Sequence, residues 1–236
     1  ALAQTLGFLS GRPEPAAATG PNFQQLAKRL QRGENPKEAI TALHRMPAEN
    51  WPSAQMNGLT QDLLSYLKEM PADRRVGQAG IEALSLGQAA ADRLPEELGQ
   101  TLRAELRQYG APVHIIRTIP ARMKYDREHI QVTAGESIRL VFENNDTMPH
   151  NLVLVTIGSR EEVGRAADEM ATQPRAWEKG YVPETKKVLQ ATRLLKPGES
   201  ELLTFNVPGK PGKYEFVCTF PGHWRTMYGV FNVNPG

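Results

Sequence analysis

The spacing of apolar residues changes near Gly110, and no other feature of the sequence constrains the fold as strongly. Before this point apolar residues recur every three or four positions, as Phe23 and Leu26 do, which is the period of an amphipathic helix. After it the apolar runs are short, rich in β-branched and aromatic residues, and bounded by Gly, Pro, Asn or Asp. The sequence therefore predicts an α+β chain of two domains: a flexible segment over 1–20, an all-α helical domain over 21–110 and a β domain over 111–236.

The first half predicts four to five short helices separated by junctions that contain Pro. Asn35 followed by Pro36 is typical of an N-cap and a first helical position, and Gly110 suits the position just after a last helix. Stacked helical hairpins, or a repeat of HEAT type, agree with this pattern, although no clear period emerges. His44 could bind a metal or act in catalysis, but an isolated His is more often an ordinary helix residue.

The second half predicts seven or eight short strands, which favours a β-sandwich. Runs such as SIRLVFENN alternate apolar with polar residues, as a strand with one buried face does. Residues 159–179 break this pattern and predict a helix inserted between strands. Ser159 is expected at its N-cap and Glu162 at its third position, which together would form a capping box.

Composition excludes several classes of function. The formal net charge is +2, and residues 1–110 carry 12 basic and 12 acidic side chains against 16 and 14 in 111–236. Neither half has the charge bias of a nucleic-acid-binding protein. No apolar run approaches the ~20 residues that span a bilayer, so no transmembrane segment is expected. The first twenty residues are not an intact signal peptide, and a start at Ala suggests a processed form or a fragment.

The only cysteine of the chain lies in the stretch FVCTFPGHWRTM, which also contains a His and a Met. Together with a His at the start of a predicted strand, this stretch offers four candidate metal ligands: His150, Cys218, His223 and Met227. Two imidazoles and a thiolate with a weak axial thioether form the ligand set of a blue-copper electron-transfer site. A buried structural Cys with incidental neighbours and a zinc site are the alternatives, although a Met ligand argues against zinc.

These residues and the strands around them resemble the cupredoxins, and among them the azurins and auracyanins, over about 113–236. CTFPGHWRTMYGVFNV matches the azurin ligand loop in spacing and character, VLQATRLLKPGESELLTFNV is similar to the region before it, and the insertion at 159–179 lies where azurins carry a helical flap. The resemblance implies a Greek-key β-sandwich that holds one type 1 copper per chain and acts as an electron carrier, not as an enzyme. Azurins usually have Gly before the first His ligand, with its carbonyl near copper; here the residue is Pro149, so four ligands are expected.

The resemblance also implies roles for residues next to the ligands. Asn151 should link the two ligand-bearing segments by hydrogen bonds, with Thr219 as its partner, and loop N–H groups should donate to the Cys sulfur. The outer edge of His223 is expected to reach the surface through an apolar docking patch, whose candidates are Met148, Pro149, Phe220, Pro221 and Trp224. Trp224 could enlarge that surface or be covered by the helical half.

The predicted function is the transfer of single electrons between redox proteins, with a c-type cytochrome or a dehydrogenase as partner. The chain would be a segment of a larger periplasmic or otherwise extracytoplasmic bacterial oxidoreductase, with the helical half as a spacer or docking scaffold. No Cys-x-x-Cys-His occurs, so no c-type haem is attached, and His114 and His129 do not supply a second copper centre. Two alternatives stay open: a copper-binding or storage module without a redox role, and a subunit that feeds electrons to an active site on another chain.

Overall fold

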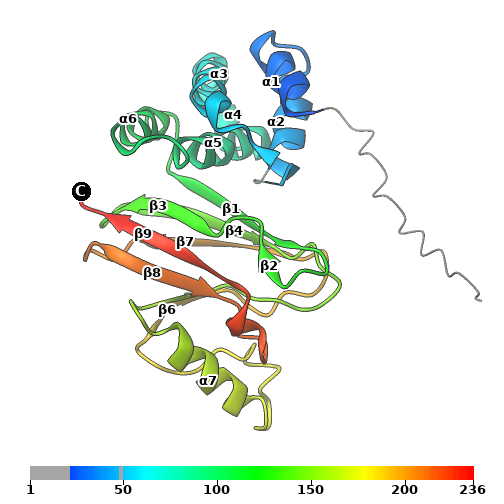
Figure 1. Ribbon diagram of the computed structural model, residues 1–236, viewed down its shortest axis with the longest axis vertical. Coiled ribbons are helices and arrows are strands. Elements are labelled where there is room, and N and C mark those ends of the chain that lie inside the picture. The colour runs from blue at the N-terminus through cyan, green and yellow to red at the C-terminus, as the bar shows by residue number, and fades with distance from the viewer. Residues whose placement is uncertain (1–21, 48–49) are drawn as a thin grey trace, which may run out of the picture.

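The computed structural model describes residues 22–47 and 50–236 of the chain. Within these ranges six α-helices precede the first strand, and a seventh lies between the fifth and sixth of nine strands (Figure 1). The predicted order of a helical region followed by a β-sandwich with a helical insertion is therefore confirmed. The predicted flexible segment over 1–20 lies outside the described residues.

The helices of the N-terminal region differ widely in length. They are α1 (Phe23–Gln31), α2 (Pro36–Arg45), α3 (Met56–Glu69), α4 (Ala72–Arg75), α5 (Gln78–Ala91) and α6 (Glu96–Arg107), with a 3₁₀ helix, η2 (Ser53–Gln55), before α3. Their lengths run from 4 residues in α4 to 14 in α3 and α5. Because no helical pair of constant size recurs, a repeat of HEAT type is not supported.

Local sequence explains where these helices begin and end. A capping box between Asn22 and Gln25 starts α1, and Gly33, at φ +67°, follows its end in the left-handed conformation. Pro36 is the first residue of α2, as predicted. Asn35 precedes it, but the expected side-chain cap is absent: this residue is itself left-handed, and its side chain makes no capping hydrogen bond.

In the part of the chain that the structure describes, nine strands form two sheets that face each other across the core (Figure 1). They are β1 (Val113–Ile119), β2 (Lys124–Tyr125), β3 (His129–Thr133), β4 (Ser137–Glu143), β5 (Val153–Val155), β6 (Val188–Ala191), β7 (Ser200–Asn206), β8 (Gly212–Val217) and β9 (Tyr228–Asn234). One sheet has the order β2-β1-β4-β7 and the other β3-β9-β8-β5-β6. The pairs β1–β4 and β3–β9 are parallel, and the other paired strands are antiparallel.

The core between the sheets is built by alternation along the strands. In β4 every second residue is buried, and Phe142 contributes the largest of these side chains. Tyr125 packs edge-on against Phe142 at 5.8 Å between ring centroids and in a tilted arrangement against Phe216 at 5.3 Å. Its hydroxyl donates to the carbonyl of Asn151 at 2.8 Å, so the core reaches the segment that carries the first predicted ligand.

The helical region packs on the outer face of β1, with α5 lying against the strand. Val113 and Ile115 belong to the apolar cluster of the helices, whereas Ile116 points into the core between the sheets. This explains why β1 is buried on both faces instead of alternating. Polar contacts join the same surfaces, including a hydrogen bond of 3.0 Å from the Ile115 N–H to the hydroxyl of Ser85.

The inserted helix is shorter than predicted. Helix α7 covers Arg160–Met170, and turns occupy most of the following segment up to β6. Ser159 is its N-cap residue, but the predicted capping box is wrong: the Ser159 hydroxyl contacts Thr156 at 2.7 Å, and Glu162 pairs with Lys187. The helix is therefore held by contacts to neighbouring segments more than by its own cap.

Candidate metal centre

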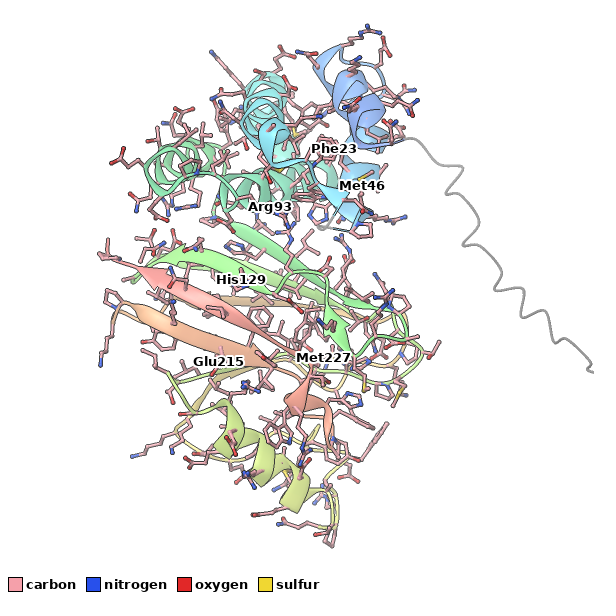
Figure 2. The ribbon with its side chains drawn as sticks, viewed as in Figure 1. Phe23, Met46, Arg93, His129, Glu215 and Met227 are labelled. Carbon is pink, nitrogen blue, oxygen red and sulfur yellow. The ribbon has the colours of Figure 1, made fainter. Side chains whose placement is uncertain are left out.

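Two strand ends place the only cysteine beside a methionine. Cys218 follows β8 directly and Met227 precedes β9, and the Cys218 N–H donates to the Met227 carbonyl at 3.0 Å. Both side chains are fully buried in the core between the sheets. Figure 2 shows Met227 on the side of the sandwich away from Phe23 and Met46 of the helical region.

The loop between these strands folds back to present a histidine. Gly222, at φ +82°, turns the chain into a 3₁₀ helix, η3 (His223–Arg225). The carbonyl of His223 accepts from the N–H of Met227 at 2.8 Å, which closes the loop into a compact turn. Three of the predicted ligands therefore come from a single tightly bonded segment.

The fourth predicted ligand comes from a distant part of the chain. His150 forms an isolated bridge with Leu195, with hydrogen bonds of 3.1 and 2.8 Å between their backbones. Three residues later the chain enters β5, which pairs with β8, the strand that leads to Cys218. The pairing of β5 with β8 is what brings His150 to the ligand loop.

The three strongest ligands converge on one point. Sγ of Cys218 lies 3.7 Å from Nδ1 of His150 and 3.7 Å from Nδ1 of His223, and the three ligand atoms lie within 4.8 Å of one another. Bonds of about 2.3 Å to sulfur and about 2.0 Å to nitrogen at a trigonal angle place the two donor atoms about 3.7 Å apart. The arrangement thus fits one metal ion in a trigonal His₂Cys site, with Met227 nearby in the same buried cluster.

Burial sets the protonation of these ligands. It raises the pKa of the Cys218 thiol to about 12, an effect that the backbone N–H groups of Asn151 and Phe220 oppose by donating to the sulfur. Burial also lowers the pKa of His223 to about 4 and that of His150 below its usual value. Both imidazoles are therefore neutral at pH 7, which is the form that binds a metal, and metal binding must displace the thiol proton.

A carboxylate that the sequence analysis missed orients His150. Oδ2 of Asp146 lies 3.1 Å from Nε2 of His150, so Nε2 carries the proton and Nδ1 is free to face Cys218. The other oxygen of Asp146 accepts from the N–H groups of Ala121 and Thr147 at 3.1 and 2.7 Å. The sequence does carry a signal for this contact: Asp146 stands four residues before His150, and a metal-bound imidazole needs an acceptor for its second nitrogen.

Asn151 joins the two segments that carry the ligands. Its Oδ1 accepts from the Thr219 N–H at 2.8 Å, and its Nδ2 donates to the Thr219 hydroxyl at 2.7 Å. The same Nδ2 donates to the carbonyl of Gly180 at 2.8 Å, in the segment after α7. Asn151 and Thr219 are both fully buried, so these hydrogen bonds have no water competing for them.

The sequence makes Trp224 a candidate for the docking patch, but its side chain is buried and does not contribute to an exposed surface. The side chain is 7% exposed and lies under α7, where a Cβ added to Gly164 would come within 2.3 Å of its ring. Its indole N–H donates to Asp168 at 2.9 Å, and the same carboxylate accepts from the Gly222 N–H at 2.7 Å. The cover of Trp224 is thus the inserted helix and not the N-terminal helical region.

The remaining residues of the predicted docking patch surround the site at different depths. Met148 is 41% exposed, while Pro149, Phe220 and Pro221 are half-buried. His223 itself is only 5% exposed, so its ring edge presents little surface of its own.

The comparisons with known proteins agree with this site. The family model described as copper binding proteins, plastocyanin/azurin family, matches residues 115–234, which include all four predicted ligands. The chain belongs to the plastocyanin/azurin family of copper-binding proteins. This family consists of electron carriers, not enzymes, and the site described above is its type 1 copper site, with His150, Cys218 and His223 clustered.

Three curated relatives each match between about a third and half of this cupredoxin chain. Auracyanin-B of Chloroflexus aurantiacus is 33% identical over 123 residues, which cover 51% of this chain and 51% of that protein. Azurin of Pseudomonas aeruginosa is 36% identical over 91 residues, covering 37% and 58%. Outer membrane protein H.8 of Neisseria meningitidis serogroup B is 31% identical over 116 residues, covering 45% and 60%. The chain thus spans between half and two thirds of the length of these relatives.

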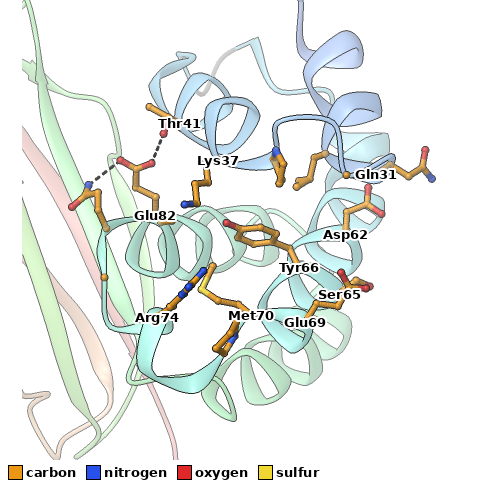
Figure 3. A pocket seen from close by; sticks show the side chains of 17 residues that line it. Gln31, Lys37, Thr41, Asp62, Ser65, Tyr66, Glu69, Met70, Arg74 and Glu82 are labelled. Carbon is orange, nitrogen blue, oxygen red and sulfur yellow. Dashed lines mark hydrogen bonds between the residues drawn. The ribbon is translucent and has the colours of Figure 1, made fainter.

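A cavity of about 910 Å³ lies in the helical region of this cupredoxin, apart from the copper site (Figure 3). Side chains of both charges line it, among them Lys37, Arg74, Asp62 and Glu69. Glu82 at its edge is held by Thr41 and Gln78 at 2.5 and 2.9 Å. All residues that line this cavity lie between positions 30 and 82, so it does not open onto the copper site.

Proposed function

We propose that this cupredoxin carries single electrons between redox proteins, with His150, Cys218, His223 and Met227 as the ligands of its copper. The observation that carries the proposal is that the Nδ1 atoms of His150 and His223 each lie 3.7 Å from the Cys218 Sγ, and that all three residues are buried. When bound there, copper supplies a one-electron Cu(II)/Cu(I) couple.

The chain's own residues prepare the site for rapid electron transfer by holding it rigid. Asp146 orients His150, the turn from Gly222 to Met227 fixes His223, and Asn151 joins the two segments. Because these contacts hold the ligand atoms in place, little nuclear rearrangement accompanies a change of charge at the site. The N–H groups of Asn151 and Phe220 stabilise the negative charge of the Cys218 thiolate.

We further propose that the chain is a segment of a larger extracytoplasmic oxidoreductase and has two domains, divided near residue 110. The family model matches residues 115–234 and does not include the helical region. One relative is named as an outer membrane protein. Among the described residues no helix is long and apolar enough to cross a membrane. The helical region packs on β1, away from the ligand loop, and so would serve as a spacer or scaffold that leaves the copper site open to a partner.

Cyclic voltammetry and stopped-flow mixing test this function. The copper-loaded chain should show a reversible one-electron wave and should exchange electrons with a c-type cytochrome in a second-order reaction. A stable copper complex that shows neither behaviour would support a storage role and contradict electron transfer.

A further inference from the structure

An unbroken series of aromatic rings connects His223 to the protein surface. The ring of His223 packs against Phe220 at 4.7 Å between centroids, and Phe220 packs against Tyr181 at 5.5 Å. Tyr181 in turn meets Trp177 edge-on at 6.3 Å. Trp177 is 50% exposed, so the series runs from a nearly buried ligand to a large exposed indole.

Because His223 is buried, the aromatic rings that cover it lie between the copper site and a partner at the surface. Because the ligand ring is only 5% exposed, an electron that passes through it must cross the side chains that cover it. Electronic coupling decays less steeply through atoms in van der Waals contact than through solvent-filled space. Phe220 covers the imidazole directly, and Tyr181 and Trp177 continue that contact outward.

The segment that carries Trp177 is anchored to the site itself. Gly180, three residues after Trp177, accepts the hydrogen bond from Asn151, the residue that also joins the ligand segments. Ala176, on the other side, is buried, and Tyr181 adopts the left-handed conformation at φ +56°. The buried Ala176 before Trp177 and the hydrogen bond to Gly180 after it hold the exposed indole in a defined position relative to the copper site.

The charges that flank Trp177 neutralise one another. Arg175 pairs with Glu178 at 2.7 Å, and Lys179 pairs with Glu184 at 2.8 Å. The surface around the indole therefore has little net charge, which suits a partner that presents an uncharged, apolar rim. An exposed aromatic side chain of this size is also the residue type that most often anchors a protein interface.

We infer that Trp177 is the docking and electron-exit residue of this chain, and that its partner is a one-electron redox protein with an exposed, apolar cofactor edge such as that of a haem. The inference rests on the proposed electron-carrier function, and it extends the docking surface of the chain beyond the residues around His223. In the exchange, the partner's haem Fe(III) gains the one electron that the Cu(I) form of the chain loses. No bond is made or broken, and no proton moves.

Stopped-flow exchange between the copper-loaded chain and a soluble c-type cytochrome tests the inference. Trp177→Leu should lower the second-order rate constant about tenfold, because it removes an interface anchor and the outer ring of the series. Trp177→Phe, which keeps an aromatic ring, should restore most of the rate. Leu202→Ala, at a residue 53% exposed on β7, should have no effect. The absorption spectrum and the potential should be the same in all variants, since Trp177 does not contact the ligands.

A second measurement needs no copper. In the ¹⁵N-labelled, metal-free chain, the indole N–H signal of Trp177 should shift when the cytochrome is added, whereas that of Trp51, buried in the helical region, should stay in place. Equal rates for the wild type and Trp177→Leu, or no shift of the Trp177 signal, would overturn the inference while the proposed function stands. A wild-type chain that forms the copper site but exchanges no electron would instead contradict the proposed function.

Discussion

The carboxylate of Asp146 contacts the outer nitrogen of His150 at 3.1 Å, while the inner nitrogen of the same ring lies 3.7 Å from the sulfur of Cys218. One side chain thereby determines the tautomer of a copper ligand and places a negative charge next to the site. Burial alone would raise the pKa of Asp146, but hydrogen bonds from Ala121, Thr147 and His150 lower it, so the carboxylate is ionised at pH 7.

Replacing this carboxylate by an amide should weaken the site. In Asp146→Asn the new NH₂ group must face either His150 or the backbone N–H groups of Ala121 and Thr147, which are all donors. Copper affinity should fall about 10- to 100-fold, as measured by competition with a chelator, and the potential should rise because Cu(II) loses a nearby negative charge. Asp73→Asn, at an exposed position in α4, is the control and should change neither quantity. Unchanged affinity in Asp146→Asn would show that Asp146 does not orient the ligand.

Removing the link between the ligand segments should cost stability. Asn151→Ala leaves the Thr219 N–H and hydroxyl and the Gly180 carbonyl without their buried partner. We expect a loss of about 2–4 kcal/mol in the free energy of unfolding of the metal-free chain, measured by urea denaturation. The control is Asn145→Ala, at an exposed position before the ligand His150, whose free energy of unfolding should remain within about 0.5 kcal/mol of the wild type. Similar stabilities for the two variants would contradict the assigned role of Asn151.

Two Gly→Ala substitutions in helices should have opposite effects. A Cβ at Gly164 would lie 2.3 Å from the ring of Trp224, so Gly164→Ala must displace α7 or the indole and should destabilise the chain by about 1–3 kcal/mol. At Gly58 in α3, no atom other than those of the adjoining residues and of the helix's own nearby backbone lies within 4 Å of the added Cβ, and Gly58→Ala should stabilise by about 0.5–1 kcal/mol. Thermal unfolding of both variants gives the comparison. A stabilised Gly164→Ala variant would mean that α7 does not pack on Trp224 as described.

His114 should make the chain sensitive to acid. Burial lowers its pKa to about 3, with Arg127, Arg103 and Arg107 adding to the effect, so the folded chain keeps this imidazole neutral where the unfolded chain protonates it. Stability from this group is complete above about pH 6.5 and is lost as the pH falls, by about 2 kcal/mol between pH 7 and pH 5. His114→Leu should flatten the dependence of unfolding free energy on pH by this amount. Equal slopes for wild type and His114→Leu would contradict the prediction.

The residues of the site that can be predicted from the sequence are those that occur at a short, regular spacing. Cys218, His223 and Met227 can be predicted because one loop between two strands carries them at the family spacing. His150 can be predicted because it follows a tight turn and shortly precedes an apolar strand, β5. The order of helices and strands follows from the change in apolar period near Gly110 for the same reason.

The parts that sequence does not predict depend on contacts between distant segments. Trp224 is covered by α7 because Gly164 leaves room for its ring, and no spacing rule links positions 164 and 224. The series from Phe220 to Trp177 likewise depends on how the segment after α7 returns to the ligand loop. Helix α7 is shorter than the helix that the sequence predicts over 159–179, because the polar residues after Met170 suit turns as well as a helix.

Absorption spectroscopy of the chain titrated with Cu(II) tests the assignment of the copper ligands most directly. A His₂Cys site predicts an intense blue band at about 600 nm that saturates at one copper per chain, arising from charge transfer between the Cys218 thiolate and Cu(II). Cys218→Ser should abolish the band, and it should persist, at a shifted position or intensity, in Met227→Ala, which removes only the axial thioether. A colourless Cu(II) complex of the wild type, or a blue band that survives Cys218→Ser, would contradict the assignment.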